Sequence, residues 1–236
     1  MPDHPHHPDF LLDRLLYRDG LMLVINKPAG LAVHAGPSSQ KGDDNLENYF
    51  DALRFGLPRP PALAHRLDRD TSGCLVLGRH PKALRKLGKL FSEGRIEKTY
   101  WAICKGAPQK PSGTIDAPLL KSAHGKGWRV KIDEAGKGAR TTYRMLAQKD
   151  GVSFIEAKPK TGRTHQIRVH LASIGAPILG DTQYGDLSAD ERGQPMMLHA
   201  RRIIIPISKN KEPVVIEAEP PDAMARLLDK LRHSPH

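Results

Sequence analysis

Residues 65–73, HRLDRDTSG, bring charged, imidazole and hydroxyl side chains together directly before the apolar run 74–77, CLVL. Prolines lead into this stretch and a glycine ends it, so we expect a loop that feeds a buried strand. Asp68 has arginines on both sides, and their positive charge keeps a carboxylate ionised. An ionised aspartate in a cleft can act as a nucleophile or a base. The same residues also fit a salt-bridged turn that only satisfies its own backbone donors.

Apolar patterns on both sides of this loop predict alternating strands and helices. Strands are expected over 21–26, 74–77, 98–104, 129–132, 141–148, 152–158, 198–207 and 214–218, and helices over 10–18, 46–55, 81–91, 164–174 and 222–231. Many strands with scattered helices predict an α/β (α+β) fold, with a mixed, largely antiparallel sheet flanked by helices. No repeat or linker interrupts the pattern, so we expect one domain over 10–236 after a disordered arm over 1–9.

Composition narrows the class of protein. The chain has 236 residues, with 37 Lys and Arg against 26 Asp and Glu, and a net charge of +11. Such a charge favours an anionic partner, with nucleic acid as the first candidate. No apolar run is long enough to span a membrane, no signal peptide is recognisable, and the two cysteines lack metal or redox spacing. We therefore expect a cytoplasmic protein that does not bind a membrane.

Basic residues gather over 82–98 and over 121–144. Clusters of this kind can follow a phosphate backbone. Scattered positive charge can equally form an ordinary solvated face, but the net charge of the chain favours RNA or DNA as the partner of these segments.

The stretch 161–170, TGRTHQIRVH, predicts a turn followed by an amphipathic helix. Either Thr161 or Thr164 is expected to cap that helix. With Arg163 and Arg168 nearby, the helix N-terminus would bind a phosphate or hold a carboxylate. An ordinary helix with a basic exposed side explains the same pattern.

Two histidines of this stretch, His165 and His170, are five residues apart. That spacing does not place them on one face of a helix. A zinc site is therefore not favoured.

Tyr100 lies in the stretch 97–102, EKTYWA, which is typical of a strand. Alternation along a strand places Lys98 and Tyr100 on one face and Trp101 on the other. A tyrosine presented in this way can stack on a base, although such tyrosines also belong to hydrophobic cores.

Residues 24–34, VINKPAGLAVH, read as the end of a buried strand followed by a turn. In one interpretation the stretch simply builds the core. In the other, Lys27 or His34 lies at the rim of a cleft.

Together and in this order, these four stretches resemble the RluA family of RNA pseudouridine synthases. The matching segments are 26–34, 65–73, 97–102, 161–170, 178–181, 184–185 and 198–200. The resemblance runs over residues 16–219. It implies a catalytic domain whose bent antiparallel sheet floors an RNA-binding cleft. It also implies isomerisation of uridine to pseudouridine without a cofactor or a metal. In this reaction the base leaves C1′ of its ribose, turns and rejoins through C5.

By this resemblance, Asp68 matches the essential aspartate of the family and Arg168 the arginine that pairs with it. Tyr100 matches the tyrosine that stacks on the uracil and takes part in proton removal from C5. Arg66 matches a residue that enters the base stack where the flipped nucleotide leaves. The remaining matches shape the loop, line the cleft or order the helix start: His65, Thr71, Arg163, His165 and Gln166.

The first motif begins by residue 17, so we expect no N-terminal S4-like module of the kind that many family members carry. The catalytic domain would then bind a structured rRNA or tRNA stem-loop through its own basic patches, as a monomer without an obligatory protein partner. The alternative is a non-catalytic RNA-binding protein on the same scaffold. Such a protein would not need Asp68, Tyr100 and Arg168 together.

Overall fold

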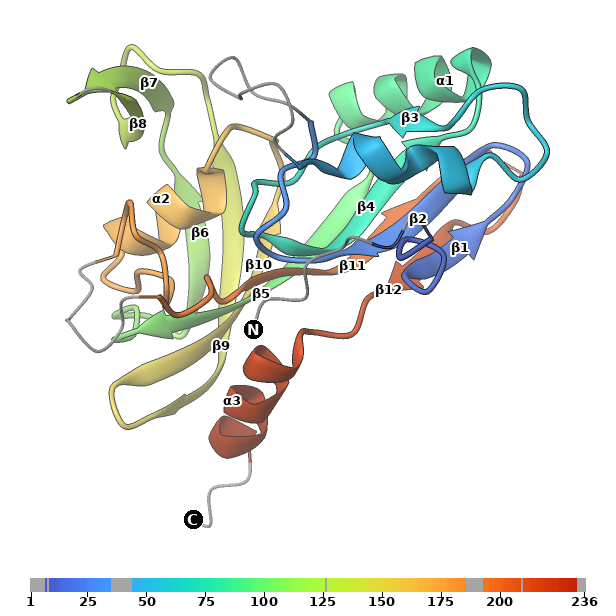
Figure 1. Ribbon diagram of the computed structural model, residues 1–236. Coiled ribbons are helices and arrows are strands. Elements are labelled where there is room, and N and C mark those ends of the chain that lie inside the picture. Colours follow the sequence, from blue (N-terminus) through green and yellow to red (C-terminus); the bar gives the residue numbers. More distant parts are fainter. Residues whose placement is uncertain are drawn as a thin grey trace. The chain divides into compact units, whose positions relative to one another are not determined.

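The computed structural model describes residues 7, 9–34, 44–125, 127–185, 193–208 and 210–232 (Figure 1). The arm predicted over 1–9 therefore lies almost entirely outside the described residues. The chain forms two compact units, Met1–Ile96 with Arg202–Glu219 and Glu97–Arg201 with Pro220–His236. None of the helices in the described part of the chain has the length and apolar character that a membrane crossing requires.

The first unit is a mostly antiparallel sheet with the strand order β1–β2–β4–β11, in which β3 pairs with β4 and β12 with β11. The strands are β1 (Leu15–Arg18), β2 (Met22–Lys27), β3 (Ala62–Leu63), β4 (Ser72–Gly78), β11 (Leu198–Ile205) and β12 (Val214–Glu217). β11 begins in the second unit and ends in the first. The apolar runs of β2 and β4 are buried throughout and form the core of this unit with β11 and β12.

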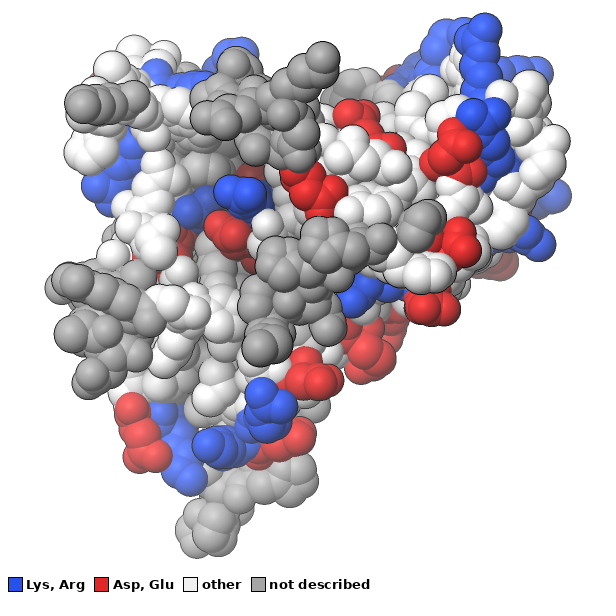
Figure 2. Space-filling view, in the orientation of Figure 1, with Lys and Arg blue, Asp and Glu red and all other residues white. Residues whose placement is uncertain are grey.

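Two helices belong to the first unit, the 3-10 helix η1 (Leu46–Leu53) and α1 (Pro81–Ser92). α1 begins after His80, whose ring nitrogen accepts a hydrogen bond from the Ala83 N–H at 3.2 Å, and Pro81 suits the first helical turn. Its apolar side packs on the core of the sheet. Its opposite side is basic, and Figure 2 shows Lys and Arg gathered over this helix. The exposed basic residues of α1 are Lys82, Arg85, Lys86 and Lys89.

The second unit continues from β11 in the order β11–β5–β10–β9–β6, with β7 and β8 as a separate hairpin. Its strands are β5 (Glu97–Lys105), β6 (Ser112–Asp116), β7 (Leu119–His124), β8 (Gly127–Ile132), β9 (Arg140–Lys149) and β10 (Val152–Pro159). Its helices are α2 (Gln166–Ser173) and α3 (Asp222–Arg232), and both pack apolar side chains against β5 and β10.

The α+β class, the antiparallel pairing and most of the predicted elements are confirmed. The helix predicted over 10–18 is wrong, because Leu15–Arg18 forms a strand on β2 with alternating exposure. Pairing with a buried strand here outweighs a weak helical spacing. The sequence pattern also missed β6 and β7, whose short and polar segments carry little periodicity.

Candidate active site

The loop that carries Asp68 joins β3 to β4, and hydrogen bonds hold it in place. The Thr71 N–H donates to the Asp68 carbonyl at 3.2 Å, which closes a turn beside the start of β4. His65 Nε2 accepts from the Val76 N–H at 3.0 Å, and its ring centroid lies 4.5 Å from that of Phe91. His65 therefore anchors the loop to β4 and α1, while Asp68 remains half-buried.

Lys27 supports the same loop from the protein interior and has no exposed surface. Its Nζ donates to the carbonyl oxygens of Pro28 at 2.7 Å, Arg69 at 2.8 Å and Thr71 at 3.0 Å. An ammonium has three donors, so each donor has an acceptor. Burial lowers the pKa of Lys27 to about 7, although the two aspartates of the loop act in the opposite direction. The interpretation that placed Lys27 at the rim of a cleft is wrong.

Two hydrogen bonds connect the turn after β2 to the Asp68 loop. The Gly30 N–H donates to the Arg69 carbonyl at 3.0 Å, and Arg69 Nε donates to the Gly30 carbonyl at 3.1 Å. Gly30 has a φ of 84°, in the left-handed region that glycine adopts without strain. Arg66, in contrast, is exposed. Two stretches that are far apart in the sequence thus form one structural feature.

In the second unit, Arg168 forms a bidentate ion pair with Asp181. Nε lies 2.7 Å from Oδ2 and Nη2 lies 2.8 Å from Oδ1, with side-chain exposures of 8% and 0%. The backbone N–H groups of Gln183 and Tyr184 also donate to Asp181 Oδ1. Burial by itself raises the pKa of Asp181, but Arg168 and these amides outweigh it, so the pKa is lowered. This carboxylate is therefore ionised, and it fixes the plane of the Arg168 guanidinium.

Gln166 orders the turn before α2. Its Oε1 accepts from the Thr161 hydroxyl at 2.7 Å and from the Arg163 N–H at 3.0 Å, while Nε2 donates to the Arg140 carbonyl at 3.0 Å. The cap position is His165, which has a φ of 53° and makes no side-chain capping bond. The prediction that Thr161 or Thr164 caps the helix is therefore wrong, because the Gln166 side chain forms the hydrogen bonds to the turn instead.

His165 links α2 to the β7–β8 hairpin through aromatic contacts. Its Nδ1 and the Tyr184 hydroxyl are hydrogen-bonded at 2.8 Å, and its ring stacks on Trp128 with centroids 5.0 Å apart. The Tyr184 hydroxyl also accepts from the Val130 N–H at 3.0 Å, and the Arg168 guanidinium lies 5.0 Å from the Tyr184 ring. Tyr184 thus contacts the hairpin, the helix start and Arg168 at once.

Tyr100 is half-buried on β5, opposite Ala157 of β10. Lys98, two residues earlier and so on the same face, donates to the Thr161 carbonyl at 3.3 Å. Trp101, on the other face, makes an edge-to-face contact with Phe154 at 5.3 Å. The alternation expected from the sequence is therefore present in β5.

Both ring nitrogens of His170 have hydrogen-bond partners within the protein. Its Nδ1 lies 2.9 Å from the Thr141 hydroxyl and its Nε2 lies 3.0 Å from the Ala117 carbonyl. Within the described ranges, no group of three or more His, Cys, Asp or Glu side chains is arranged to hold a metal ion.

The predicted residues fall into two groups. Asp68 and Arg66 belong to the first unit, whereas Tyr100 and Arg168 belong to the second. Asp181 received no role from the sequence, although it ends the matching segment 178–181. An aspartate after a glycine is also common in turns, so its residue type alone does not mark it.

Comparison with known proteins identifies the class. The family model described as RNA pseudouridylate synthase matches residues 21–173. An uncharacterized RNA pseudouridine synthase of Zymomonas mobilis is 47% identical over 92% of this chain and 98% of its own length. The ribosomal large subunit pseudouridine synthase C of Haemophilus ducreyi is 38% identical over 94% of this chain and 70% of its own length.

A solved structure agrees with these relatives. The human RNA pseudouridylate synthase domain containing 4 is 28% identical, with a TM-score of 0.80 over 97% of both chains. The fold is thus that of an RNA-modifying isomerase. The chain belongs to the RNA pseudouridylate synthase family, and its resemblance to the RluA family is confirmed.

Proposed function

We propose that this chain converts specific uridines of structured rRNA or tRNA to pseudouridine, with large-subunit rRNA as the favoured substrate. In this isomerisation the bond from N1 to C1′ breaks and a bond from C5 to C1′ forms. The proton on C5 leaves, and N1 gains a proton. The observation that carries the proposal is the Asp68 loop. This chain belongs to the family, and the buried Lys27 holds the loop that contains Asp68. The name of the Haemophilus relative supports the choice of RNA.

Asp68 is the essential carboxylate, acting as a nucleophile or as a base on the target nucleotide. Its loop is suited to this role because three carbonyl oxygens around it are fixed by Lys27 or by the turn. A reacting group that is already in position avoids the entropic cost of ordering it.

Arg168 is the residue that pairs with Asp68 and keeps it oriented. The Asp181 carboxylate supports this role, because it accepts hydrogen bonds from both Nε and Nη2 and so limits the rotation of the Arg168 guanidinium. Asp181 is then a positioning residue, which acts on the reaction through Arg168.

Tyr100 stacks on the extracted uracil, and its hydroxyl takes part in removal of the proton from C5. Tyr100→Phe keeps the ring but removes the hydroxyl. We expect RNA binding to remain and product formation to slow about a hundredfold, in the range of general acid–base effects. An unchanged single-turnover rate in this variant would contradict the role of the hydroxyl.

Arg66 fills the place of the flipped uridine in the base stack. Flipping costs a few kcal/mol of unstacking, and a planar guanidinium can recover part of it by stacking. The exposure of Arg66 supports this role. Arg66→Ala should weaken RNA binding, and an unchanged affinity would count against it.

The two units act as one catalytic domain over 10–236, in a cytoplasmic monomer that uses no cofactor. Exposed basic residues on α1, among them Arg85 and Lys86, contribute to RNA affinity. These parts of the proposal follow from the resemblance and the net charge of the chain.

Pseudouridine mapping tests the reaction. Total RNA from cells that lack the gene is compared with RNA from cells restored with the wild type or with Asp68→Asn. We expect a site that is lost on deletion and restored by the wild type alone. Pseudouridine formed at the normal rate by purified Asp68→Asn would remove Asp68 from its role. Tight RNA binding by the wild type without any product would favour the non-catalytic alternative.

A further inference from the structure

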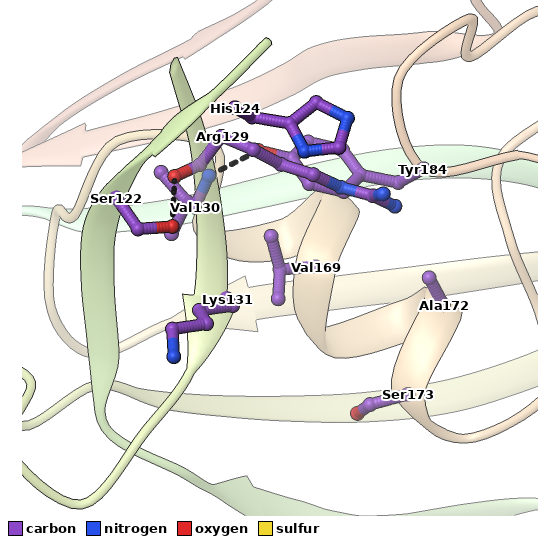
Figure 3. Close-up of a pocket in the computed structure, with 9 residues that line it drawn as sticks. All are labelled: Ser122, His124, Arg129, Val130, Lys131, Val169, Ala172, Ser173 and Tyr184. Carbon is purple, nitrogen blue, oxygen red and sulfur yellow. Dashed lines mark hydrogen bonds between the residues drawn. The ribbon is translucent and has the colours of Figure 1, made fainter.

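A pocket in the second unit has no part in the mechanism above. It lies between the β7–β8 hairpin and α2, with a volume of about 440 Å³ (Figure 3). Sites for small organic molecules have about 300–1,000 Å³, so the pocket can hold a ligand of the size of a nucleotide. Its lining residues are Ser122, His124, Arg129, Val130, Lys131, Val169, Ala172, Ser173 and Tyr184.

One wall of the pocket is apolar and fixed. Val130 and Val169 are buried and pack together in a small core cluster, and the Tyr184 ring lies against it. The hydrogen bond from the Val130 N–H to the Tyr184 hydroxyl, drawn in Figure 3, holds the ring to the hairpin. Ala172 adds a small side chain from α2 and leaves space beside the valines. The flat face of a nucleobase ring fits this wall.

The charged part of the pocket favours an anion. The Arg129 guanidinium lies 5.1 Å from the Tyr184 ring, and His124 is exposed at the same end of the pocket in Figure 3. Lys131 Nζ lies 2.6 Å from Asp133, so this pair contributes little net charge. Arg129 is therefore the group best placed to meet a phosphate.

The pocket is also close to the candidate active site within the same unit. Tyr184 lines the pocket, and the Arg168 guanidinium lies 5.0 Å from its ring. A ligand in the pocket is thus separated from Arg168 by one side chain. RNA-binding proteins hold unpaired bases on aromatic side chains, and enzymes that extrude a base pack it between aromatic or apolar side chains.

We propose that this pocket binds one unpaired nucleotide of the RNA substrate, distinct from the target uridine. Its base lies against Val130, Val169 and Ala172, and its phosphate meets Arg129. The inference rests on the proposed function, because it assigns the pocket to the same RNA, and it adds a site that selects the sequence context of the modified uridine.

Binding of a labelled hexacytidylate to the full chain, followed by fluorescence anisotropy, tests the pocket, because this probe contains no uridine and so no target base. Ala172→Phe fills the pocket from α2. We expect its affinity to fall about tenfold, because the phenyl ring takes the space that the base would occupy beside the valines. The matched control is Ala225→Phe, which changes a half-buried alanine of α3 outside the pocket and should bind like the wild type. Equal affinities for the two variants would overturn the proposal.

Arg129→Gln tests the phosphate contact even if Ala172→Phe fails to fold. Removing one phosphate contact should lower the slope of log affinity against log salt by about 0.7, the value for single strands. Arg226→Gln, at an exposed position of α3, is the control and should leave the slope unchanged. An unchanged slope in Arg129→Gln would overturn the phosphate contact. A hexamer without bases that binds as tightly as hexacytidylate would overturn the placement of the base.

Turnover on ribosomal RNA separates this inference from the proposed function. We expect Ala172→Phe to raise KM, whereas Ala225→Phe should not. If the wild type forms pseudouridine and Ala172→Phe has the same KM and the same affinity for hexacytidylate, the pocket proposal alone is wrong. If hexacytidylate binding depends on Ala172 but the wild type forms no pseudouridine, the proposed function alone is wrong.

Discussion

Each unit holds a buried cation at its candidate site, and the two cations are bound in different ways. Lys27 donates to three carbonyl oxygens, whereas Arg168 makes two parallel bonds to the Asp181 carboxylate. Carbonyl groups carry no net charge, so burial lowers the pKa of Lys27 to about 7. A guanidinium remains protonated in proteins, and Asp181 neutralises its charge. The support of the Asp68 loop therefore changes with pH near and above neutrality, whereas the Arg168–Asp181 pair keeps both of its charges over that range.

Asp181→Asn breaks the Arg168–Asp181 pair and should have the largest effect. It removes a fully buried partner that binds Arg168 in a bidentate manner, and breaking a buried pair of this kind costs about 3–5 kcal/mol. Urea unfolding measures the loss. The control is Asp116→Asn, which removes a surface pair with Arg140 that is more than half exposed and should cost at most about 1 kcal/mol. Equal losses in the two variants would show that Asp181 is not an essential counterion.

Lys27→Met removes the pH-sensitive support and should cost about 2 kcal/mol. The carbonyl oxygens that Lys27 satisfied lose a donor, and a buried acceptor without a donor costs about 1–3 kcal/mol. The Arg69 carbonyl keeps its bond from the Gly30 N–H, which limits the loss. Urea unfolding again provides the measurement, with Lys89→Met, at an exposed position of α1, as the control. A variant as stable as the wild type would mean that Lys27 does not hold the loop.

Arg168→Lys keeps the charge but loses the planar fork that binds Asp181 in a bidentate manner. We expect turnover on ribosomal RNA to fall about tenfold, or about 1.4 kcal/mol in the transition state. Single-turnover kinetics check this expectation, and RNA affinity shows whether binding is affected separately. Near-normal turnover would remove the bidentate geometry from the mechanism.

The pH dependence of stability is the most direct test of the comparison, and over one pH unit its effect is no larger than that of Arg168→Lys. In the folded state the pKa of Lys27 is lowered from 10.5 to about 7, so between these values the unfolded chain binds more protons. Stability then rises with pH across this window, by at most about 1.4 kcal/mol per pH unit. Wild type and Lys27→Met are unfolded in urea at two pH values inside the window. A constant difference between them would contradict the lowered pKa.

The sequence predicted those helices and strands in which the spacing of apolar residues matches the side that is buried in the folded protein. The apolar runs of β2 and β4 are buried, and α1 starts at Pro81 with its apolar residues on one side. The strand β1 was missed because its assignment depends on pairing with β2 rather than on its own residues. Similarly, the capping prediction for α2 was wrong because Gln166, and not Thr161 or Thr164, reaches the turn.

The sequence by itself determined the net charge of this protein, the residues of the loop around Asp68, and the presence of Tyr100 and Arg168 in the motifs that match the family. Only the tertiary structure decided how the two cations are bound. Lys27 meets carbonyl groups 42 and 44 residues later in the chain, and Arg168 meets a carboxylate 13 residues later. The pKa and orientation of a charged group depend on the neighbours that replace its water. Those neighbours are brought together by folding, and their order along the chain does not show them.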